Sequence, residues 1–203
     1  RVVELLLRHG AEINLQRSDG IIALIVAAQE GHERVVELLL RHGAEIDLQN
    51  SHGATALMGA AGNGHERVVD LLLQRGAEID LQESNGATAL MFAANQGHPA
   101  IVLRLLRAGA DMAVRDEKGK TALMIAAVFN QPAVVLRLLR AGADTALRSE
   151  NGWTALQAAK ENGHAECVRA LEEHAAAEAE AEAAARETEA AAREAVRAAA
   201  EAE

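Results

Sequence analysis

Histidines that recur along the chain are the residues in this sequence with the clearest potential for chemistry. His32, His65, His98 and His164 each follow a glycine, and imidazole nitrogens are common ligands of zinc. If the segments that carry them stack side by side, equivalent histidines lie roughly 10 Å apart, whereas every ligand of a zinc ion lies about 2 Å from it. The spacing therefore argues against a metal site and favours histidines that hydrogen-bond across the turn between two helices.

Three other patterns resemble reactive or cofactor-binding motifs but lack essential features. The segment HERVV occurs twice, yet Val36 or Val69 stands where the zinc-protease motif H-E-x-x-H needs its second histidine. The segment GNGHER at Gly62 lacks the Lys-Ser/Thr of a phosphate-binding loop. Cys167 falls on an apolar helical stripe, whereas a reactive thiolate needs exposed, cationic surroundings. We predict no catalytic residue, no metal site and no cofactor, so the protein is not expected to be an enzyme.

The composition of the 203-residue chain narrows the classes of partner. The net charge is −10, and aromatic residues make up 1% of the chain (Trp153, Phe92 and Phe129), so it lacks the basic surface and stacking platforms typical of nucleic-acid-binding proteins. The single cysteine excludes an intramolecular disulfide, and no apolar run approaches the roughly 18 residues of a membrane span. With no signal peptide, these features favour an intracellular, cytoplasmic protein that binds neither nucleic acid nor membrane. The start at Arg1, inside a repeat, indicates a fragment or a missing native beginning.

A 33-residue period organises most of the chain. The segment GHERVVELLLRHGAEIDLQ at Gly31 returns as GHERVVDLLLQRGAEIDLQ at Gly64, and the same offset relates the TAL segments that begin at Thr55, Thr88 and Thr121. Self-similarity at this period without a register slip is typical of solenoid proteins, in which each unit buries its apolar face only against its neighbours.

Local signals predict two helices in each unit. A turn glycine comes first, and a threonine then serves as the N-cap of a short helix such as ALMGAAGN. After a Gly-His break, a longer helix such as ERVVDLLLQR shows apolar residues at i, i+3 and i+4, and a glycine that favours the left-handed conformation ends it.

Two departures from the pattern concern capping and packing. Ile22 replaces the capping threonine in the first full unit, which we expect to cost about 1 kcal/mol locally. Gly59 and Phe92 occupy the same helix position in adjacent units, a small and a large side chain that we expect to interdigitate.

The pattern resembles the ankyrin repeat, whose signature T-P-L-H appears here as Thr55-Ala56-Leu57-Met58 and its copies, without the proline and the histidine. The resemblance implies an all-α repeat solenoid of helix-turn-helix units with β-hairpin fingers. The expected organisation is an ankyrin repeat domain at 1–174 and a helical extension at 175–203. The domain divides into a partial repeat at 1–16, repeats 1 to 4 at 17–49, 50–82, 83–115 and 116–148, and a C-terminal capping repeat 5 at 149–174.

The resemblance also implies a binding surface, because ankyrin proteins usually engage partners with their finger tips and the ends of their first helices. Trp153, the sole tryptophan, occupies an outward finger position, and packing on its own repeat is the alternative. Val128 and Phe129 are the apolar pair in a polar row of first-helix ends. The polar candidates on the fingers are Glu117, Lys118, Lys120 and Glu150.

A second candidate surface lies on the longer helices. Repeats 1 and 2 read Glu37-Leu38 and Asp70-Leu71, whereas repeats 3 and 4 read Leu103-Arg104 and Leu136-Arg137. In the orientation that the resemblance implies, Leu103 and Leu136 project outward beside a row of arginines. The alternative is that they are ordinary exposed leucines.

The extension at 175–203 begins where four earlier repeats have glycine. Ala175 replaces Gly43, Gly76, Gly109 and Gly142, and almost only Ala, Glu and Arg follow. All three are strong helix formers, so we predict that the last helix of repeat 5 continues through Ala175. Its function stays open between a solvated spacer, an oligomerisation element and an engineered extension.

These features favour a non-enzymatic scaffold that binds a protein partner with a rigid surface centred on repeats 3 to 5. The alternative is a self-assembling subunit of a homo-oligomer or filament, which uses the solenoid ends, the Leu103/Leu136 ridge or the C-terminal helix. A third reading is an accessory module of a larger enzyme.

Overall fold

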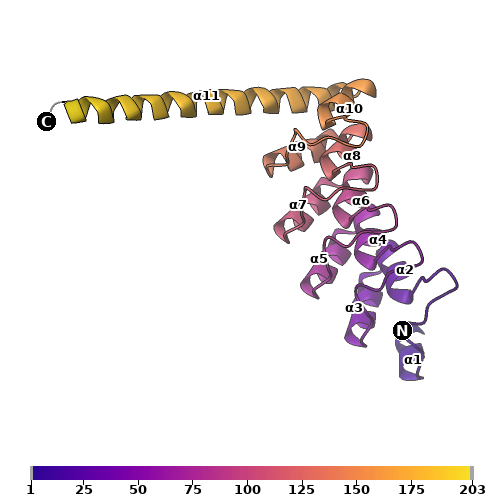
Figure 1. The fold of residues 1–203 in the computed structure, drawn as a ribbon. Helices are drawn as coiled ribbons and strands as arrows, with labels where there is room; N and C mark the ends of the chain where they lie inside the picture. The colour runs from indigo at the N-terminus through magenta and orange to yellow at the C-terminus, as the bar shows by residue number, and fades with distance from the viewer. Residues whose placement is uncertain (1, 202–203) are drawn as a thin grey trace.

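The protein is a single stack of helix pairs from which one long helix projects. The structure, a computed structural model, describes the backbone of residues 2–201 and the side chains of residues 2–193. Its helices are α1 (Val2–Arg8), α2 (Ala23–Gln29), α3 (Glu33–Arg41), α4 (Ala56–Gly62), α5 (Glu66–Gln74), α6 (Ala89–Gln96), α7 (Pro99–Arg107), α8 (Ala122–Val128), α9 (Pro132–Arg140), α10 (Ala155–Glu161) and α11 (Ala165–Glu201). The first helices of the repeats form one row and the second helices another (Figure 1). This confirms the predicted all-α repeat solenoid.

The core is thin because the helices approach each other across alanines. Ala60, Ala61, Ala93 and Ala94 on α4 and α6 are fully buried, and their small side chains allow close contact between the first helices. One leucine on each second helix is also fully or almost fully buried, at Leu39, Leu72, Leu105 and Leu138. The buried residues form one continuous cluster from Ile22 to Leu171, so each repeat is stabilised by its neighbours.

The fingers are tight turns and not the β-hairpins that were predicted. No β-strand occurs among residues 2–201. In one finger, the backbone N–H of Gly86 donates to the carbonyl of Glu83 at 2.8 Å, and the N–H of Glu83 donates to the carbonyl of Ala87 at 3.0 Å. Between fingers, Ser84 N–H donates to the carbonyl of His52 at 2.7 Å. One such hydrogen bond at each junction joins the fingers in a row without building the repeated ladder of a sheet.

Helix caps follow the sequence prediction. The hydroxyls of Thr55, Thr88 and Thr121 each accept a hydrogen bond from the backbone N–H three residues on, whereas Ile22 provides no side-chain cap. The cap of α10 is stronger than expected, because the side chain of Gln157 also bonds the backbone N–H of Thr154. This reciprocal pair is a capping box.

The histidines of the Gly-His steps join successive repeats, which differs from the predicted bond across their own turn. His65 Nε2 lies 2.8 Å from the carbonyl oxygen of Gln29, and His98 Nε2 lies 3.1 Å from that of Gly62. His164 Nδ1 makes the same contact with the carbonyl oxygen of Ala127 at 2.9 Å. These side chains therefore satisfy carbonyls at the ends of the preceding first helices, while His32 in repeat 1 is exposed.

Repeat 4 keeps this link without a Gly-His step. Asn130 adopts the left-handed φ of +53° in place of glycine, a conformation that asparagine tolerates better than most residues. Gln131 Nε2 donates to the carbonyl of Asn95 at 3.0 Å, and Pro132 begins α9.

The expected interdigitation of Gly59 and Phe92 is wrong. A Cβ atom at Gly59 would lie 2.5 Å from Cγ of Gln29, in the preceding repeat. The ring of Phe92 instead covers Gly62, where a Cβ atom would lie 3.5 Å from its Cδ1 atom. Neighbouring first helices are shifted by about one helical turn, so a residue contacts the side of the preceding first helix three positions beyond its own equivalent.

The predicted continuation of the last helix is confirmed, because α11 passes through Ala175 without a break. Residues 175–193 are exposed throughout, and the helix extends away from the stack (Figure 1). Glu172, which replaces a leucine of earlier repeats, is exposed and pairs with Lys160 Nζ at 2.7 Å. The predicted boundary at 174/175 thus lies inside one helix.

Replacing Ala175 with proline is expected to separate the extension from repeat 5. Proline removes one backbone hydrogen bond of α11 and its ring clashes with the preceding turn, at a cost of about 3 kcal/mol. Amide hydrogen exchange should therefore accelerate in residues 176–190 far more than in α4 to α9. Ala175→Gly is the milder control, at about 1 kcal/mol. Unchanged exchange in the proline variant would show that the extension does not depend on helical continuity.

Candidate protein-binding groove

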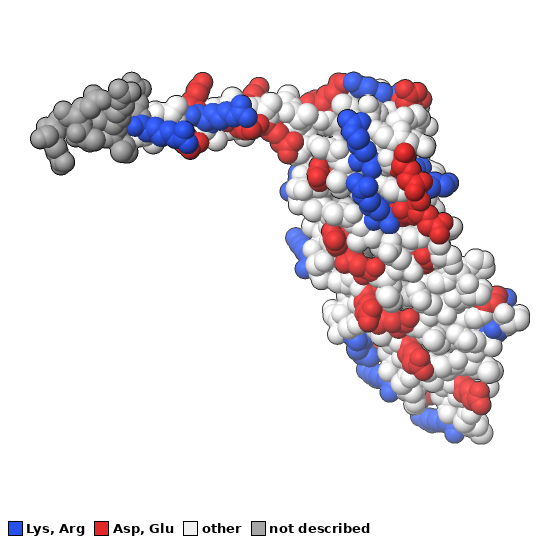
Figure 2. All heavy atoms as spheres, in the orientation of Figure 1, with Lys and Arg blue, Asp and Glu red and all other residues white. Residues whose placement is uncertain are grey.

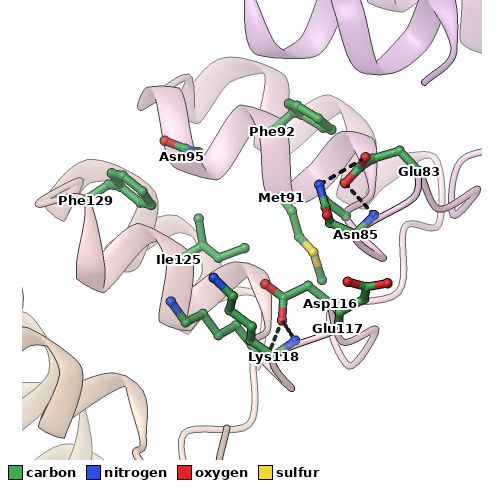
Figure 3. A pocket seen from close by; sticks show the side chains of 12 residues that line it. Glu83, Asn85, Met91, Phe92, Asn95, Asp116, Glu117, Lys118, Ile125 and Phe129 are labelled. Carbon is green, nitrogen blue, oxygen red and sulfur yellow. Dashed lines mark hydrogen bonds between the residues drawn. The ribbon is translucent and has the colours of Figure 1, made fainter. Parts of the chain in front are cut away.

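The fingers and first helices of repeats 3 and 4 enclose a groove, which we call groove A. It has a volume of about 410 Å³. Its apolar surface comes from Met91 and Phe92 of α6 and from Ile125 and Phe129 at and after α8. Ile125 and Phe129 are four residues apart and therefore point to the same side of the helix. Figure 3 shows these side chains beside the two fingers that complete the groove.

The rim of groove A is polar and carries both signs of charge. Asp116 is committed to its own turn, since its Oδ1 atom accepts hydrogen bonds from the backbone N–H groups of Lys118 at 2.9 Å and Lys120 at 2.7 Å. Glu83 likewise accepts from the backbone N–H of Asn85 at 3.1 Å. Among the described residues, Lys118 and Lys120 form no ion pair, so their ammonium groups are available to a ligand.

A smaller groove, groove B, lies between repeats 4 and 5. It has a volume of about 220 Å³ and shares Lys120 with groove A. Val128 of α8 and Trp153 of the fifth finger provide its largest apolar surfaces, and Asn151 and Asn162 provide amide groups. The two grooves are adjacent, so an extended segment of a partner can contact both.

The structure brings together six of the nine residues that the sequence predicted. Glu117, Lys118, Lys120 and Phe129 line groove A, and Lys120, Val128 and Trp153 line groove B. Phe129 and Trp153 are 51% and 41% exposed. Trp153 therefore does not pack down fully on its own repeat.

The other three predicted residues lie elsewhere. Glu150 is exposed on the fifth finger, where its backbone N–H donates to the carbonyl of Lys118 at 3.0 Å, but its side chain lines neither groove. Leu136 on α9 is 39% exposed, as predicted. Leu103 on α7 is half-buried and lines a surface recess between α7 and α9. Both leucines belong to the row of second helices, away from the grooves.

Sequence reasoning missed Met91, Phe92 and Ile125 as groove residues. Helical spacing was the available signal. Phe92 and Ile125 each lie four residues after the N-cap threonine of their helix. This position is on the same helix face as the residue at the end of the first helix, such as Phe129, which was predicted to bind a partner. Sequence reasoning also missed Val26 at that position in repeat 1, which is 42% exposed. Repeat 1 therefore also carries an exposed apolar residue on this face of its first helix.

The two grooves offer apolar and charged contact surface. Within residues 2–193, no three His, Cys, Asp or Glu side chains are close enough together to hold a metal ion. None of the helices in the described part of the chain is sufficiently long and apolar to cross a membrane. On the face drawn in Figure 2, acidic and basic side chains lie next to each other over the repeats. An apolar floor with a mixed polar rim is the usual anatomy of a protein–protein contact.

Cys167 is buried in α11, as the apolar stripe predicted. Burial raises the pKa of its thiol, the neighbouring Glu166 carboxylate raises it further, and a backbone hydrogen bond at Gln131 lowers it. The first two causes disfavour the thiolate, which is the reactive form.

We expect Cys167 to react with a disulfide reagent much more slowly in the folded protein than in the urea-unfolded chain at pH 8. Because the thiolate is disfavoured only in the fold, the contribution of this group to stability is complete below its ordinary pKa of about 8.5 and decreases as the pH rises above it. A Cys167→Ala variant should lack this alkaline decrease. Equal labelling rates in the folded and unfolded states would contradict the burial of the thiol.

Comparison with known families agrees with the geometry. A family model described as "Ankyrin repeats (3 copies)" matches residues 1–83 and 76–149, and a model described as "Ankyrin repeat" matches residues 151–181. No curated protein shows a significant match to the chain. Ankyrin repeats generally mediate protein–protein interaction and are generally non-catalytic. The matches cover most of the chain and confirm the resemblance seen in its repeats, so the protein belongs to the ankyrin repeat family.

Proposed function

We propose that this protein is a non-catalytic scaffold that binds a protein partner in grooves A and B. The observation that carries the proposal is the placement of two partly exposed aromatic residues, Phe129 and Trp153, in adjacent grooves with polar rims. Aromatic anchors in central pockets contribute most of the binding energy in many protein interfaces.

The grooves are preformed, which favours binding without large rearrangement. Their walls belong to helices that are buried on the opposite face, and the fingers are joined by backbone hydrogen bonds such as Glu117 N–H to the carbonyl of Asn85 at 2.8 Å. A partner therefore does not have to offset the entropy of ordering the site. We expect the occupant to be an extended peptide segment. Its apolar side chains would fill the grooves, and an acidic side chain would pair with the ammonium group of Lys120.

The proposal is tested by selecting binders from a displayed library of peptide segments with the full chain as bait, followed by affinity measurements on variants. Trp153→Ala and Phe129→Ala should each weaken binding about thirtyfold, equivalent to about 2 kcal/mol. Asn63→Ala, which changes the position in repeat 2 equivalent to Phe129, should change the affinity less than about twofold. Because Trp153 is the sole tryptophan, its fluorescence gives an independent signal of occupancy. Binders that tolerate both aromatic changes but fail with Asn63→Ala would place the interface on the other half of the stack.

A further inference from the structure

Repeats 3 and 4 carry a basic and apolar surface on their second helices, opposite in character to the acidic chain as a whole. We call it the arginine face and define it by Leu103, Arg104, Arg107, Leu136, Arg137 and Arg140. Between α7 and α9 it contains a recess of about 310 Å³, which Leu103, Leu106, Arg107, Arg137, Arg140 and Ala141 line. The positions that correspond to the two arginines are Leu38 and Arg41 in repeat 1 and Leu71 and Gln74 in repeat 2, so arginine occupies both positions only in repeats 3 and 4.

Most of the charge on this face has no partner among the side chains that the structure describes. Arg104 is the exception, because its guanidinium lies 2.7 Å from Glu66 and 3.4 Å from Asp70. Arg107, Arg137 and Arg140 form no ion pair with any residue whose side chain is described. Three guanidinium groups beside exposed leucine surface therefore favour an acidic ligand that also has an apolar side.

The extension of α11 is both acidic and apolar in this way, because it consists mainly of glutamate and alanine. Two of its glutamates are paired on the helix itself, Glu182 with Arg186 and Glu189 with Arg193, each at 2.6 Å. A second stripe has glutamates seven residues apart at Glu173, Glu180 and Glu187, which form no ion pair with the described side chains. The sequence repeats this spacing at positions 194 and 201. Figure 2 shows the projecting helix with its charged groups open to solvent.

The spacing of this stripe matches the spacing of the repeats. Seven residues of α-helix rise about 10.5 Å, and helices in contact pack about 8–10 Å apart. Arg107 and Arg140 occupy equivalent positions one repeat apart, on helices α7 and α9. A helix that crosses α7 and α9 can therefore place Glu180 and Glu187 over these two arginines, with the alanines between the glutamates against Leu136.

Glu173 lies in repeat 5 at the position equivalent to Arg140, but Glu180 and Glu187 cannot reach the arginine face of their own molecule. Helix α11 is continuous from Ala165, and Figure 1 shows its extension projecting away from the stack with α7 and α9 below it. We propose that the arginine face of one molecule binds Glu180 and Glu187 on the α11 extension of a second copy of this chain. The overall charge of −10 opposes association, so the attraction is local and weakens as salt screens it.

Sedimentation velocity of the full chain over a range of concentrations tests the proposal. The wild type should associate at low salt, and Arg107→Glu/Arg140→Glu should weaken the association at least about tenfold. The matched control is Arg41→Glu/Arg75→Glu, which makes the same change in net charge on repeats 1 and 2 and should associate more than the face variant. Circular dichroism melts establish that each variant is folded.

A charge exchange makes the test specific for the two surfaces. Glu180→Arg/Glu187→Arg should also weaken self-association, and its mixture with Arg107→Glu/Arg140→Glu should restore a complex. A wild type that stays monomeric up to about 1 mM at low salt would overturn the proposal, as would a mixture that does not associate. A monomeric chain that instead binds an unrelated acidic helix would assign the face to a different partner. These outcomes are independent of grooves A and B, which the variants do not alter.

Discussion

Leu105→Ala is expected to lower the free energy of unfolding by about 2–5 kcal/mol. Leu105 lies on α7 in the central repeat and is 0% exposed. Its truncation leaves a cavity inside the continuous buried cluster of the stack. The loss combines the transfer free energy of the removed atoms with the cost of that cavity.

Because Leu105 lies in the middle of the stack, its truncation should also make unfolding less cooperative. Each repeat is stabilised by its two neighbours, so weakening repeat 3 also reduces the coupling between repeats 1–2 and 4–5. Urea unfolding followed by circular dichroism should show a lower midpoint and a broader transition. Leu136→Ala on the next second helix is the control, because that side chain is 39% exposed and its truncation should cost about 1 kcal/mol or less. Equal effects of the two changes would contradict the assigned core.

Gly86→Ala is expected to destabilise the fold by about 2–5 kcal/mol, for two reasons that add. Gly86 has a φ of +77°, a left-handed conformation that costs an alanine roughly 1–2 kcal/mol. An added Cβ atom would also lie 3.0 Å from Cα of Asp116 and from the backbone nitrogen of Glu117 in the next finger. Backbone atoms cannot move aside as a flexible side chain can, so we expect this overlap to contribute about 1–3 kcal/mol more.

Gly76→Ala separates the two contributions. Gly76 has a φ of +87°, yet apart from its own neighbours in the chain no residue lies within 4 Å of a Cβ atom built there. Its replacement should therefore cost only the roughly 1–2 kcal/mol of backbone conformation. Thermal unfolding of the two variants measures the difference, which reports the packing of one finger on the next. If both variants lose the same stability, the fingers are not in the close contact described.

The Gly86 variant also connects the fold to the proposed function. Asn85 and Ala87, on either side of Gly86, line groove A together with Lys118 and Lys120 of the next finger. Displacing one finger from the other changes the width of the groove. We therefore expect Gly86→Ala to weaken partner binding and Gly76→Ala to leave it nearly unchanged, even at temperatures where both variants are fully folded.

The sequence by itself determined the repeat, the helices and the extension. The period of 33 residues, the threonine caps and the replacement of a terminal glycine by Ala175 are signals that act within one or two helical turns. The backbone conformation they specify does not depend on the neighbouring repeat. The resemblance to ankyrin repeats that these signals carry then implied that Phe129 and the finger residue Trp153 lie at the surface.

Only the tertiary structure decided how one repeat lies on the next. It placed His65 against the carbonyl of Gln29, 36 residues earlier, and Phe92 over Gly62 instead of Gly59. It also left Leu103 half-buried while Leu136 is exposed, although the two leucines are equivalent in sequence. These contacts depend on the shift and rotation between neighbouring helices, which are set by the packing of all side chains in the layer together. A repeat pattern specifies which residues are equivalent, but their contacts are decided by side chains more than 30 residues away.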